Sequence, residues 1–339
     1  MAADTLKKRW QGRKPDTVPA PFQVLALSGG GYRGLFSAMI LEEMEKRAGK
    51  PLRECFDLIA GTSIGGIIAC GIAAGVPAAR MRAEFERQGK GIFERRIGLP
   101  GGHSFRVPRF GILGAKYTRK GLEAAVSGTL GKAAGMRLSD VAKPLVVTAV
   151  SATNGSAVLF DSRTNGSMKD VTLREVALST SAAPTYFPEF NIGGNSLVDG
   201  GIVANAPDVV AMLKSMSVFG QRPEEVRMLS VGTAGGVMGE VFRDGRSAGA
   251  LKWMVARNLF GLTVGAQQEL SLGLVRDLLG ERYLRIDVTP DSARAKVIAL
   301  DKANSTATAT LRELSKQAMD DADRQRGGDL AAFLRHSAS

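Results

Sequence analysis

The chain is poor in the residues that usually hold metals or cross-link secreted proteins: 339 residues include two histidines and two cysteines. Cys55 and Cys70 cannot cross-link a chain of this length, so we expect a reducing compartment. No C-x-x-C or H-E-x-x-H sequence and no Cys/His cluster is present. A dedicated zinc site is therefore not expected, and no organic cofactor is implied.

Aromatic residues make up only 6% of the chain, which disfavours a single-strand nucleic-acid binder that stacks bases on aromatic rings. The first twenty residues are basic and contain no apolar segment of the kind found in secretory signals. Residues 1–20 are therefore predicted to form a basic, disordered arm.

The longest stretch without a charged residue is Leu58–Ala79, which has the length of a membrane span. It contains five glycines and Pro77, and it begins with a short β-like run that a Gly-Thr-Ser break ends. A buried strand, a tight turn and a buried helix explain this pattern better than a transmembrane helix does.

Positive charge is in excess, with a net charge of +12. Residues 80–120 carry eleven basic side chains against three acidic ones, so most of the excess lies in this basic segment. Clustered Lys and Arg suit a phosphorylated ligand or an anionic bilayer, and a solvated helix face is the simpler alternative.

The apolar pattern predicts alternating strands and helices. A buried strand at Gln23–Ser28 precedes a helix at Tyr32–Ala48, and a strand at Phe56–Ala60 precedes a second helix after Ser63. This order implies a parallel sheet with a right-handed crossover. A hairpin is expected from strands at Pro144–Ser151 and Ser156–Asp161, and further short strands at Ser196–Val198, Arg227–Val231 and Tyr283–Val288. Helices are expected at Leu173–Ser181 and Pro207–Met216, with a long apolar helical stretch at Ser247–Leu279 and a terminal helix at Ala303–Arg326.

The first motif is the glycine-rich run from Gly29 to Gly34, which satisfies G-x-G-x-x-G between a strand and a helix. Such a loop holds a pyrophosphate in dinucleotide-binding folds, or its amides stabilise the oxyanion of a hydrolase. A dinucleotide fold also needs an acidic residue at the carboxyl end of the second strand. That position is occupied here by Gly-Thr-Ser, whereas Asp57 lies at the other end, so the oxyanion role is favoured.

The second motif, Gly61-Thr62-Ser63-Ile64-Gly65, is a G-x-S-x-G at a strand–turn–helix junction. This is the context of a nucleophile elbow, in which a strained turn exposes the serine. A helix-capping serine is the structural alternative. We predict Ser63 as the nucleophile.

A serine nucleophile requires a base, and the histidines are badly placed to provide one. His103 lies among glycines and prolines, and His336 lies three residues from the end, where fraying is expected. A carboxylate acting directly on the serine is then the better hypothesis. Asp199, before Gly200-Gly201, and Asp161 both end predicted strands, and Asp199 is favoured.

Together these motifs resemble the patatin-like phospholipase family, over roughly residues 22–208. The matching segments are Ser-Gly-Gly-Gly-Tyr-Arg-Gly at 28–34, Gly-Thr-Ser-Ile-Gly at 61–65 and Asp-Gly-Gly at 199–201, followed by Asn-Ala-Pro at 205–207. The resemblance implies a three-layer α/β/α fold with a mostly parallel central sheet. It also implies a catalytic domain over residues 21–210, which an extension over 211–339, largely helical, completes.

The same resemblance implies particular roles for the motif residues. Ser63 would be the nucleophile and Asp199 the base. The amides of Gly29, Gly30 and Gly31, together with Arg33, would form the oxyanion site. The implied activity is that of a carboxylic ester hydrolase, a phospholipase A, that releases fatty acids from membrane phospholipids without metal or cofactor.

The residues of the first motif further resemble those of bacterial patatin-like effectors of CBASS anti-phage defence. That implies activation by a cyclic dinucleotide such as cyclic GMP-AMP (cGAMP), and a cytoplasmic protein acting peripherally on the inner face of the membrane. The basic segment would then meet the activator or an anionic membrane surface, and the apolar stretch at 247–279 would serve core packing, a homo-oligomer interface or a lipid-facing lid. No nucleic acid polymer is expected as a partner.

Three alternatives remain open at this point. One is an unregulated patatin-like lipase or esterase. A second is an oxidoreductase that binds a dinucleotide through residues 29–34, and a third is a nucleic-acid-binding module that depends on net charge alone.

Overall fold

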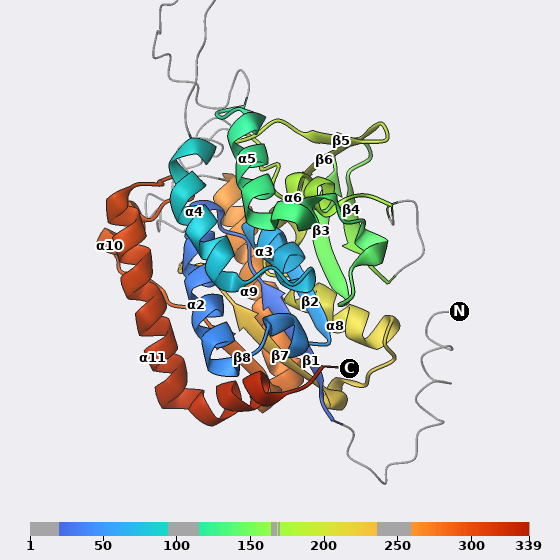
Figure 1. Cartoon of the computed structure of the whole chain (residues 1–339), viewed down its shortest axis with the longest axis vertical. Helices are drawn as coiled ribbons and strands as arrows, with labels where there is room; N and C mark the ends of the chain where they lie inside the picture. The colour runs from blue at the N-terminus through green and yellow to red at the C-terminus, as the bar shows by residue number, and fades with distance from the viewer. Residues whose placement is uncertain (1–19, 94–114, 164–167, 169, 236–258, 339) are drawn as a thin grey trace, which may run out of the picture.

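A computed structural model describes residues 20–93, 115–163, 168, 170–235 and 259–338. Its described part contains an eight-stranded mixed sheet in the order β5-β6-β3-β2-β1-β7-β8, with β4 also paired to β3 (Figure 1). Strands β3, β2, β1, β7 and β8 are parallel to one another, whereas β4, β5 and β6 pair in antiparallel fashion. The strands are β1 (Phe22–Leu27), β2 (Leu58–Thr62), β3 (Leu145–Ser151), β4 (Ser156–Asp161), β5 (Phe190–Ile192), β6 (Asn195–Asp199), β7 (Val226–Val231) and β8 (Tyr283–Ile286).

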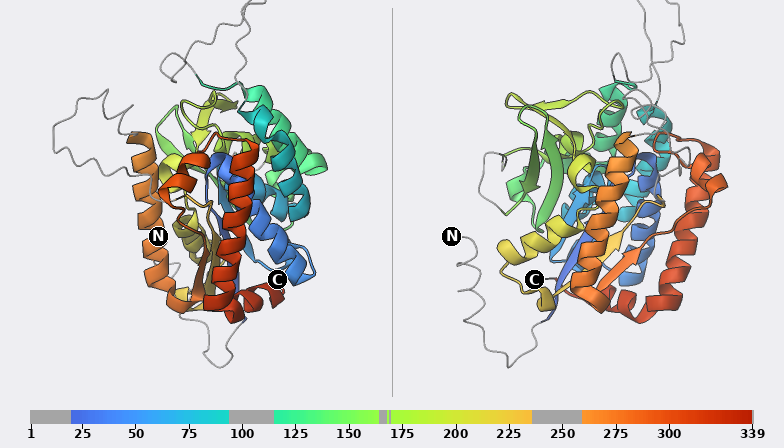
Figure 2. Two further views of the ribbon diagram at one scale, coloured as in Figure 1. Left: turned by 90° about the vertical axis from the view of Figure 1, so that its left-hand side faces the viewer. Right: turned by 180° about the vertical axis from the view of Figure 1, so that it is seen from behind.

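Helices cover both faces of this sheet, because successive side chains of its central strands are buried on opposite sides. Leu25 and Ile59 pack into a core with α2, α3 and α11, while Val24 and Leu58 pack into a second core with α8 and α9. In the left view of Figure 2, α9 (orange) lies on one side of the strands and α2 and α4 (blue to cyan) on the other. The α-helices are α2 (Gly34–Ala48), α3 (Ile64–Ala73), α4 (Ala78–Ile92), α5 (Arg119–Leu130), α6 (Leu173–Thr180), α7 (Gly201–Ala204), α8 (Asp208–Ser217), α9 (Leu259–Leu279), α10 (Ser292–Val297) and α11 (Ser305–Arg335).

The uncharged run at 58–79 forms β2, a turn and α3, all inside the protein, as its glycines predicted. In the part of the chain that the structure describes, no helix has the length and apolarity needed to cross a membrane. The hairpin and the strands β7 and β8 also lie where the sequence predicts them. Helices α4 and α5 were not predicted: charged side chains separate the buried ones of α4, and α5 contains two glycines.

Within the described part of the basic segment, several charged side chains form ion pairs with other residues of the same chain. Arg82 pairs with glutamates at 42 and 86, Arg87 pairs with Glu84, and Lys116 pairs with Asp301. These pairs favour the structural interpretation for this part of the segment. Four further arginines of the segment, at 95, 96, 106 and 109, lie outside the described residues, as do His103 and nearly all of the predicted arm.

Residues 336–338 are held against the fold, which corrects the expectation that His336 lies in a frayed segment. Its Nε2 lies 3.0 Å from Oδ2 of Asp57, and the amide of Ala338 donates to the carbonyl of Glu54. These contacts lie at the amino end of β2, whereas the G-x-S-x-G turn follows its carboxyl end. His336 therefore belongs to the fold rather than to the predicted site.

Candidate active site

Ser63 lies on the sharp turn between β2 and α3 and has φ +56° and ψ −127°. A residue other than glycine rarely adopts a positive φ, so the backbone of this turn is strained and is held in place by its surroundings. The amide of Ser63 donates to Oγ1 of Thr180 at 2.8 Å, and that hydroxyl donates to the carbonyl of Thr148. The turn has the backbone geometry of a nucleophile elbow, as the motif predicted.

The glycines of the motif are required by close backbone contacts. A Cβ atom on Gly65 would lie 2.3 Å from the carbonyl oxygen of Leu27, and one on Gly61 would lie 2.3 Å from that of Gly65. Both distances are far below any van der Waals contact. Residues with side chains at these positions would push the serine turn away from β1.

Asp199 reaches Ser63 because β2 and β6 meet end to end along the same edge of β3. Residue Thr148 of β3 pairs with Thr62, and the next residue, Ala149, pairs with Asp199. Strand β4 pairs along this whole stretch and so occupies the other edge. The sequence placed Asp199 at a strand end correctly, but the strand is antiparallel and arrives from the opposite direction.

The two side chains form a short hydrogen bond, in which Oγ of Ser63 donates to Oδ2 of Asp199 at 2.6 Å. The other carboxylate oxygen accepts the amide of Gly201 at 2.7 Å. Burial raises the pKa of Asp199 to about 6, although the bonds from Ser63 and Gly201 act in the opposite direction. A carboxylate of raised pKa, bonded to a hydroxyl, is a suitable general base near neutral pH.

The raised pKa predicts the pH dependence of activity. Asp199 accepts a proton only when ionised, so kcat/KM should fall about tenfold per pH unit below pH 6 and level off above it. Initial rates of hydrolysis of a soluble ester between pH 4.5 and 9 measure this profile. A rate that is flat through pH 6, or that rises on acidification, contradicts a carboxylate base.

The glycine-rich loop follows β1 and lies directly beside the nucleophile. A Cβ on Gly29 would lie 3.1 Å from Cβ of Ser63, so the absence of a side chain allows this approach. The amide of Gly29 is already bonded to the carbonyl of Asn205 at 2.9 Å, which differs from its expected oxyanion role. Among the described residues, the amides of Gly30 and Gly31 have no acceptor, and they are the donors that remain for an oxyanion.

Arg33 lines the same pocket as the glycine loop and Ser63. Burial lowers the pKa of its guanidinium, against the opposing influence of Asp287 and Tyr186, and its buried Nε has no partner among the described residues. A desolvated cation with an unused donor stabilises nearby negative charge effectively. Its placement agrees with the expected contribution to the oxyanion site.

The pocket above the dyad has a volume of about 400 Å³. The glycine loop and Ser63 form one part of its wall, and apolar side chains form much of the rest. Those side chains come from α4, α5, the segment after α6 and α9: Phe85, Leu122, Tyr186, Phe187, Phe260 and Val264. An apolar recess that begins at a nucleophile can hold a hydrocarbon chain.

Helix α9 lines part of this pocket through residues of its first half, including Phe260 and Val264. Its residues Leu272, Val275 and Leu279 are buried in the core, as the packing interpretation of 247–279 expects. Leu270 and Leu274 are exposed. The helix therefore has a packed side and an uncovered apolar side, and residues 247–258 of the predicted stretch lie outside the described residues.

Asp161, the alternative base, is engaged elsewhere. It ends β4 on the far edge of β3, and its Oδ2 lies 2.7 Å from Nζ of Lys214. Asp57 likewise lies at the amino end of β2, which leaves the dinucleotide interpretation without a ribose-binding carboxylate. Within the described residues, no group of acidic, Cys and His side chains could hold a metal ion.

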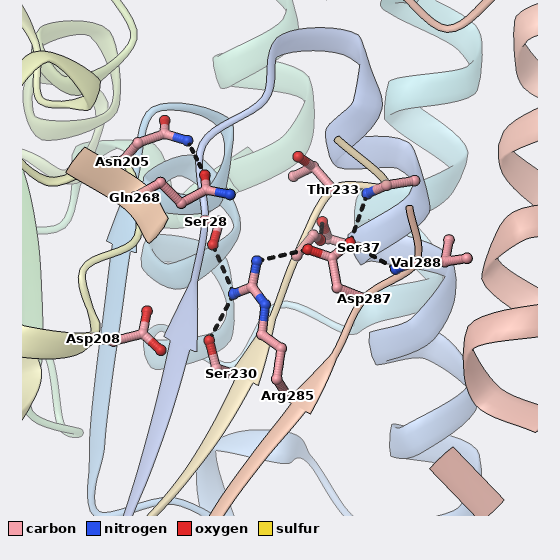
Figure 3. A network of polar contacts seen from close by, with 12 residues as sticks. Ser28, Ser37, Asn205, Asp208, Ser230, Thr233, Gln268, Arg285, Asp287 and Val288 are labelled. Atoms are coloured by element: carbon pink, nitrogen blue, oxygen red, sulfur yellow. Dashed lines mark hydrogen bonds and ion pairs between the residues drawn. The ribbon is translucent and has the colours of Figure 1, made fainter. Parts of the chain in front are cut away.

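Sequence reasoning missed several residues that support the site. Thr180 holds the serine turn, and Thr233 donates to the carbonyl of Gly29. Asn205 donates to that carbonyl and to Gln268, and Figure 3 shows its hydrogen bond to Gln268. Single short polar side chains at helix ends and in loops give no periodic signal. The strand Tyr283–Val288 did carry one, since Arg285 and Asp287 alternate there with apolar residues.

The comparisons with known proteins agree with this geometry. A family model described as patatin-like phospholipase matches residues 25–212. The chain belongs to the patatin-like phospholipase family. The protein is therefore an ester hydrolase of the phospholipase type, and the expected three-layer α/β class is confirmed.

Individual relatives extend this similarity beyond the matched region. A Pseudomonas aeruginosa protein named cGAMP-activated phospholipase is 36% identical over 88% of this chain and 87% of its own length. A Vibrio cholerae protein with the same name is 29% identical over 87% of this chain and 89% of its own. The solved structure of human GIVD cytosolic phospholipase A2 is 13% identical, with a TM-score of 0.41, over 98% of this chain and 62% of that one.

Proposed function

We propose that this patatin-like phospholipase releases fatty acids from membrane phospholipids through a Ser63–Asp199 dyad. The observation that carries the proposal is the 2.6 Å hydrogen bond between Oγ of Ser63 and Oδ2 of Asp199 beside an apolar pocket. No histidine is needed, because the carboxylate accepts the serine proton directly.

The first half of the reaction acylates the enzyme. Asp199 takes the proton of the Ser63 hydroxyl while Oγ attacks the ester carbonyl carbon. Negative charge develops on the carbonyl oxygen, and the amides of Gly30 and Gly31 donate to it, with Arg33 nearby. The intermediate then collapses, the C–O bond to the lysophospholipid breaks, and Asp199 returns the proton to the leaving oxygen.

The second half regenerates the enzyme. A water molecule gives its proton to Asp199 and attacks the acyl carbon. The tetrahedral intermediate uses the same donors, the bond to Oγ of Ser63 breaks, and the serine recovers its proton. The fatty acid leaves, and no metal or organic cofactor takes part.

Fatty-acid release from phospholipid vesicles, together with labelling of Ser63 by a fluorophosphonate, tests this function. Release with labelling at Ser63 supports the dyad. Labelling without release from any phospholipid indicates an esterase or lipase for other esters. The absence of both labelling and release would contradict the proposal. It would return the dinucleotide and nucleic-acid alternatives to consideration.

We further propose activation by a cyclic dinucleotide, because two relatives are named cGAMP-activated phospholipases. The protein would then act in anti-phage defence, in the cytoplasm, on the inner face of the membrane. The uncovered apolar side of α9 would be available for membrane contact or for a homo-oligomer.

Adding cGAMP to the protein should raise fatty-acid release at least about tenfold, which corresponds to about 1.4 kcal/mol of coupling. Release is measured from anionic vesicles with cGAMP, with a linear dinucleotide of the same bases as the control, and with no nucleotide. Equal release in all three samples indicates an unregulated lipase and leaves the dyad proposal intact.

A further inference from the structure

A charged pair lies beneath the glycine-rich loop, at the carboxyl end of β8. Nη2 of Arg285 lies 2.7 Å from Oδ2 of Asp287, and Nη1 of the same arginine donates to Oγ of Ser28 at 2.9 Å and of Ser230 at 2.7 Å (Figure 3). Ser28 immediately precedes Gly29, and Ser230 lies in β7. One guanidinium therefore joins the ends of three neighbouring strands.

This arginine remains charged inside the protein. Burial lowers its pKa, but Asp287, Tyr283 and Asp208 outweigh that effect, so the net pKa of Arg285 is raised. A buried ion pair adds little net stability compared with apolar packing, but it fixes the geometry of the groups that bond to it. Neither Arg285 nor Asp287 lines the pocket above the dyad.

The second oxygen of Asp287 shapes the segment after β7. Oδ1 accepts the amide of Ala234 at 3.0 Å and that of Val288 at 2.9 Å. Ala234 has φ +53°, a left-handed conformation that an alanine adopts only when it is held. At Gly232 a Cβ would lie 1.7 Å from Oδ2 of Asp287, so this turn is closely fitted around the carboxylate.

The segment 232–235 is the support on which the glycine loop rests. Oγ1 of Thr233 donates to the carbonyl of Gly29 at 3.3 Å, and a Cβ on Gly30 would lie 2.4 Å from that hydroxyl oxygen. A Cβ on Gly235 would lie 2.7 Å from Nη2 of Arg33. A shift of this segment therefore moves the loop amides or the arginine of the oxyanion site.

We propose that Arg285 and Asp287 are positioning residues, which hold the 232–235 turn and thereby direct the amides of Gly30 and Gly31 toward the transition-state oxyanion. The proposal rests on the proposed function, because it assigns these residues a part in the same hydrolysis. They act through the loop and do not touch substrate.

The test is the Asp287→Asn variant of the full chain, assayed on a soluble ester with and without a trifluoromethyl ketone inhibitor. Such a ketone adds to Ser63 and forms a tetrahedral oxyanion. We expect kcat to fall about 10- to 100-fold with KM changed less than about twofold, since losing one oxyanion donor costs about 10²- to 10³-fold and a displaced donor costs less than a lost one. Affinity for the ketone should fall by the same factor, whereas affinity for the fatty-acid product should not change.

A second substitution separates positioning from general damage. Glycine adopts a positive φ without strain, so Ala234→Gly in the Asp287→Asn background should recover at least about fivefold in kcat. The matched control is Asp161→Asn, which breaks another ion pair of 2.7 Å, on β4, and should leave the ketone affinity unchanged. If Asp287→Asn does not fold, Ser28→Ala, which removes one contact of Arg285, should show the same parallel loss of kcat and ketone affinity.

Three results would overturn the inference: kcat and ketone affinity within about twofold of the parent, loss of kcat without loss of ketone affinity, or no recovery with Ala234→Gly. Ester hydrolysis that persists in Ser63→Ala contradicts the proposed function itself. The two failures are therefore distinguishable.

Discussion

Replacing Ser63 with alanine should lower ester hydrolysis by about 10⁴-fold or more, because no other atom at this turn can form the acyl-enzyme. The expected residual rate comes from the remaining polarising groups of the pocket. Initial rates with a soluble ester and with phospholipid vesicles measure the loss, and labelling by a fluorophosphonate should disappear with it. The fold should persist, since Ser63→Ala keeps Cβ and the hydrogen bond from the backbone amide of residue 63 to Oγ1 of Thr180.

Ser215→Ala is the matched control for this variant. Ser215 is a buried serine of α8, where its hydroxyl donates to the carbonyl of Ala211 at 2.9 Å, and it does not line the pocket. Its replacement should leave both hydrolysis and labelling at the parent level. Ser63→Ala that still hydrolyses esters at a tenth of the parent rate would sink the assignment of the nucleophile.

Replacing Asp199 with asparagine should lower kcat by about 10³- to 10⁴-fold, since the amide cannot accept the serine proton. The variant should be at least as stable as the parent at pH 8. A carboxyl whose folded pKa is raised, from 3.8 to about 6, stabilises the fold below pH 4 and loses that contribution as pH rises through 6. Ionised Asp199 therefore costs about 3 kcal/mol at pH 8, and the asparagine has no such cost.

Thermal unfolding at pH 4.5 and pH 8 checks the stability part of this prediction. The parent should lose stability relative to Asp199→Asn at the higher pH, and the difference between the two proteins should shrink at the lower one. Asp161→Asn is the matched control for activity, because Lys214 engages that carboxylate on the other edge of β3. Equal losses of kcat in Asp161→Asn and Asp199→Asn would argue against Asp199 as the base.

Much of the fold was predictable because its central strands are short apolar runs bounded by glycines. The nucleophile turn was predictable for the same reason: the G-x-S-x-G motif falls where a buried strand ends, and Gly65 leaves room for β1. The scarcity of histidine predicted a carboxylate base before any relative was considered. These are local properties, and local sequence is sufficient to express them.

What the sequence did not predict depends on contacts between distant segments. Asp199 meets Ser63 because β2 and β6 pair with the same edge of β3, and no pattern in the sequence of β6 indicates that this strand runs antiparallel to β3. The amide of Gly29 is bonded to Asn205, 176 positions later, so the motif alone could not separate it from the amides of Gly30 and Gly31. The ordered end of the chain at His336 depends likewise on Asp57, which lies at the start of β2.

The order of the strands has a consequence for synthesis of the protein. Strand β1 is made first but lies between β2 and β7, and β7 pairs in turn with β8. Ser63 and the glycine loop thus leave the ribosome long before Thr233, Arg285 and Asp287, on which that loop rests. A nascent chain longer than 199 but shorter than 287 residues contains Ser63 and Asp199, yet it lacks Asp287, which holds the turn beneath the glycine loop. If the proposed dyad is correct, hydrolytic competence is therefore expected only after β8 and Asp287 have been synthesised.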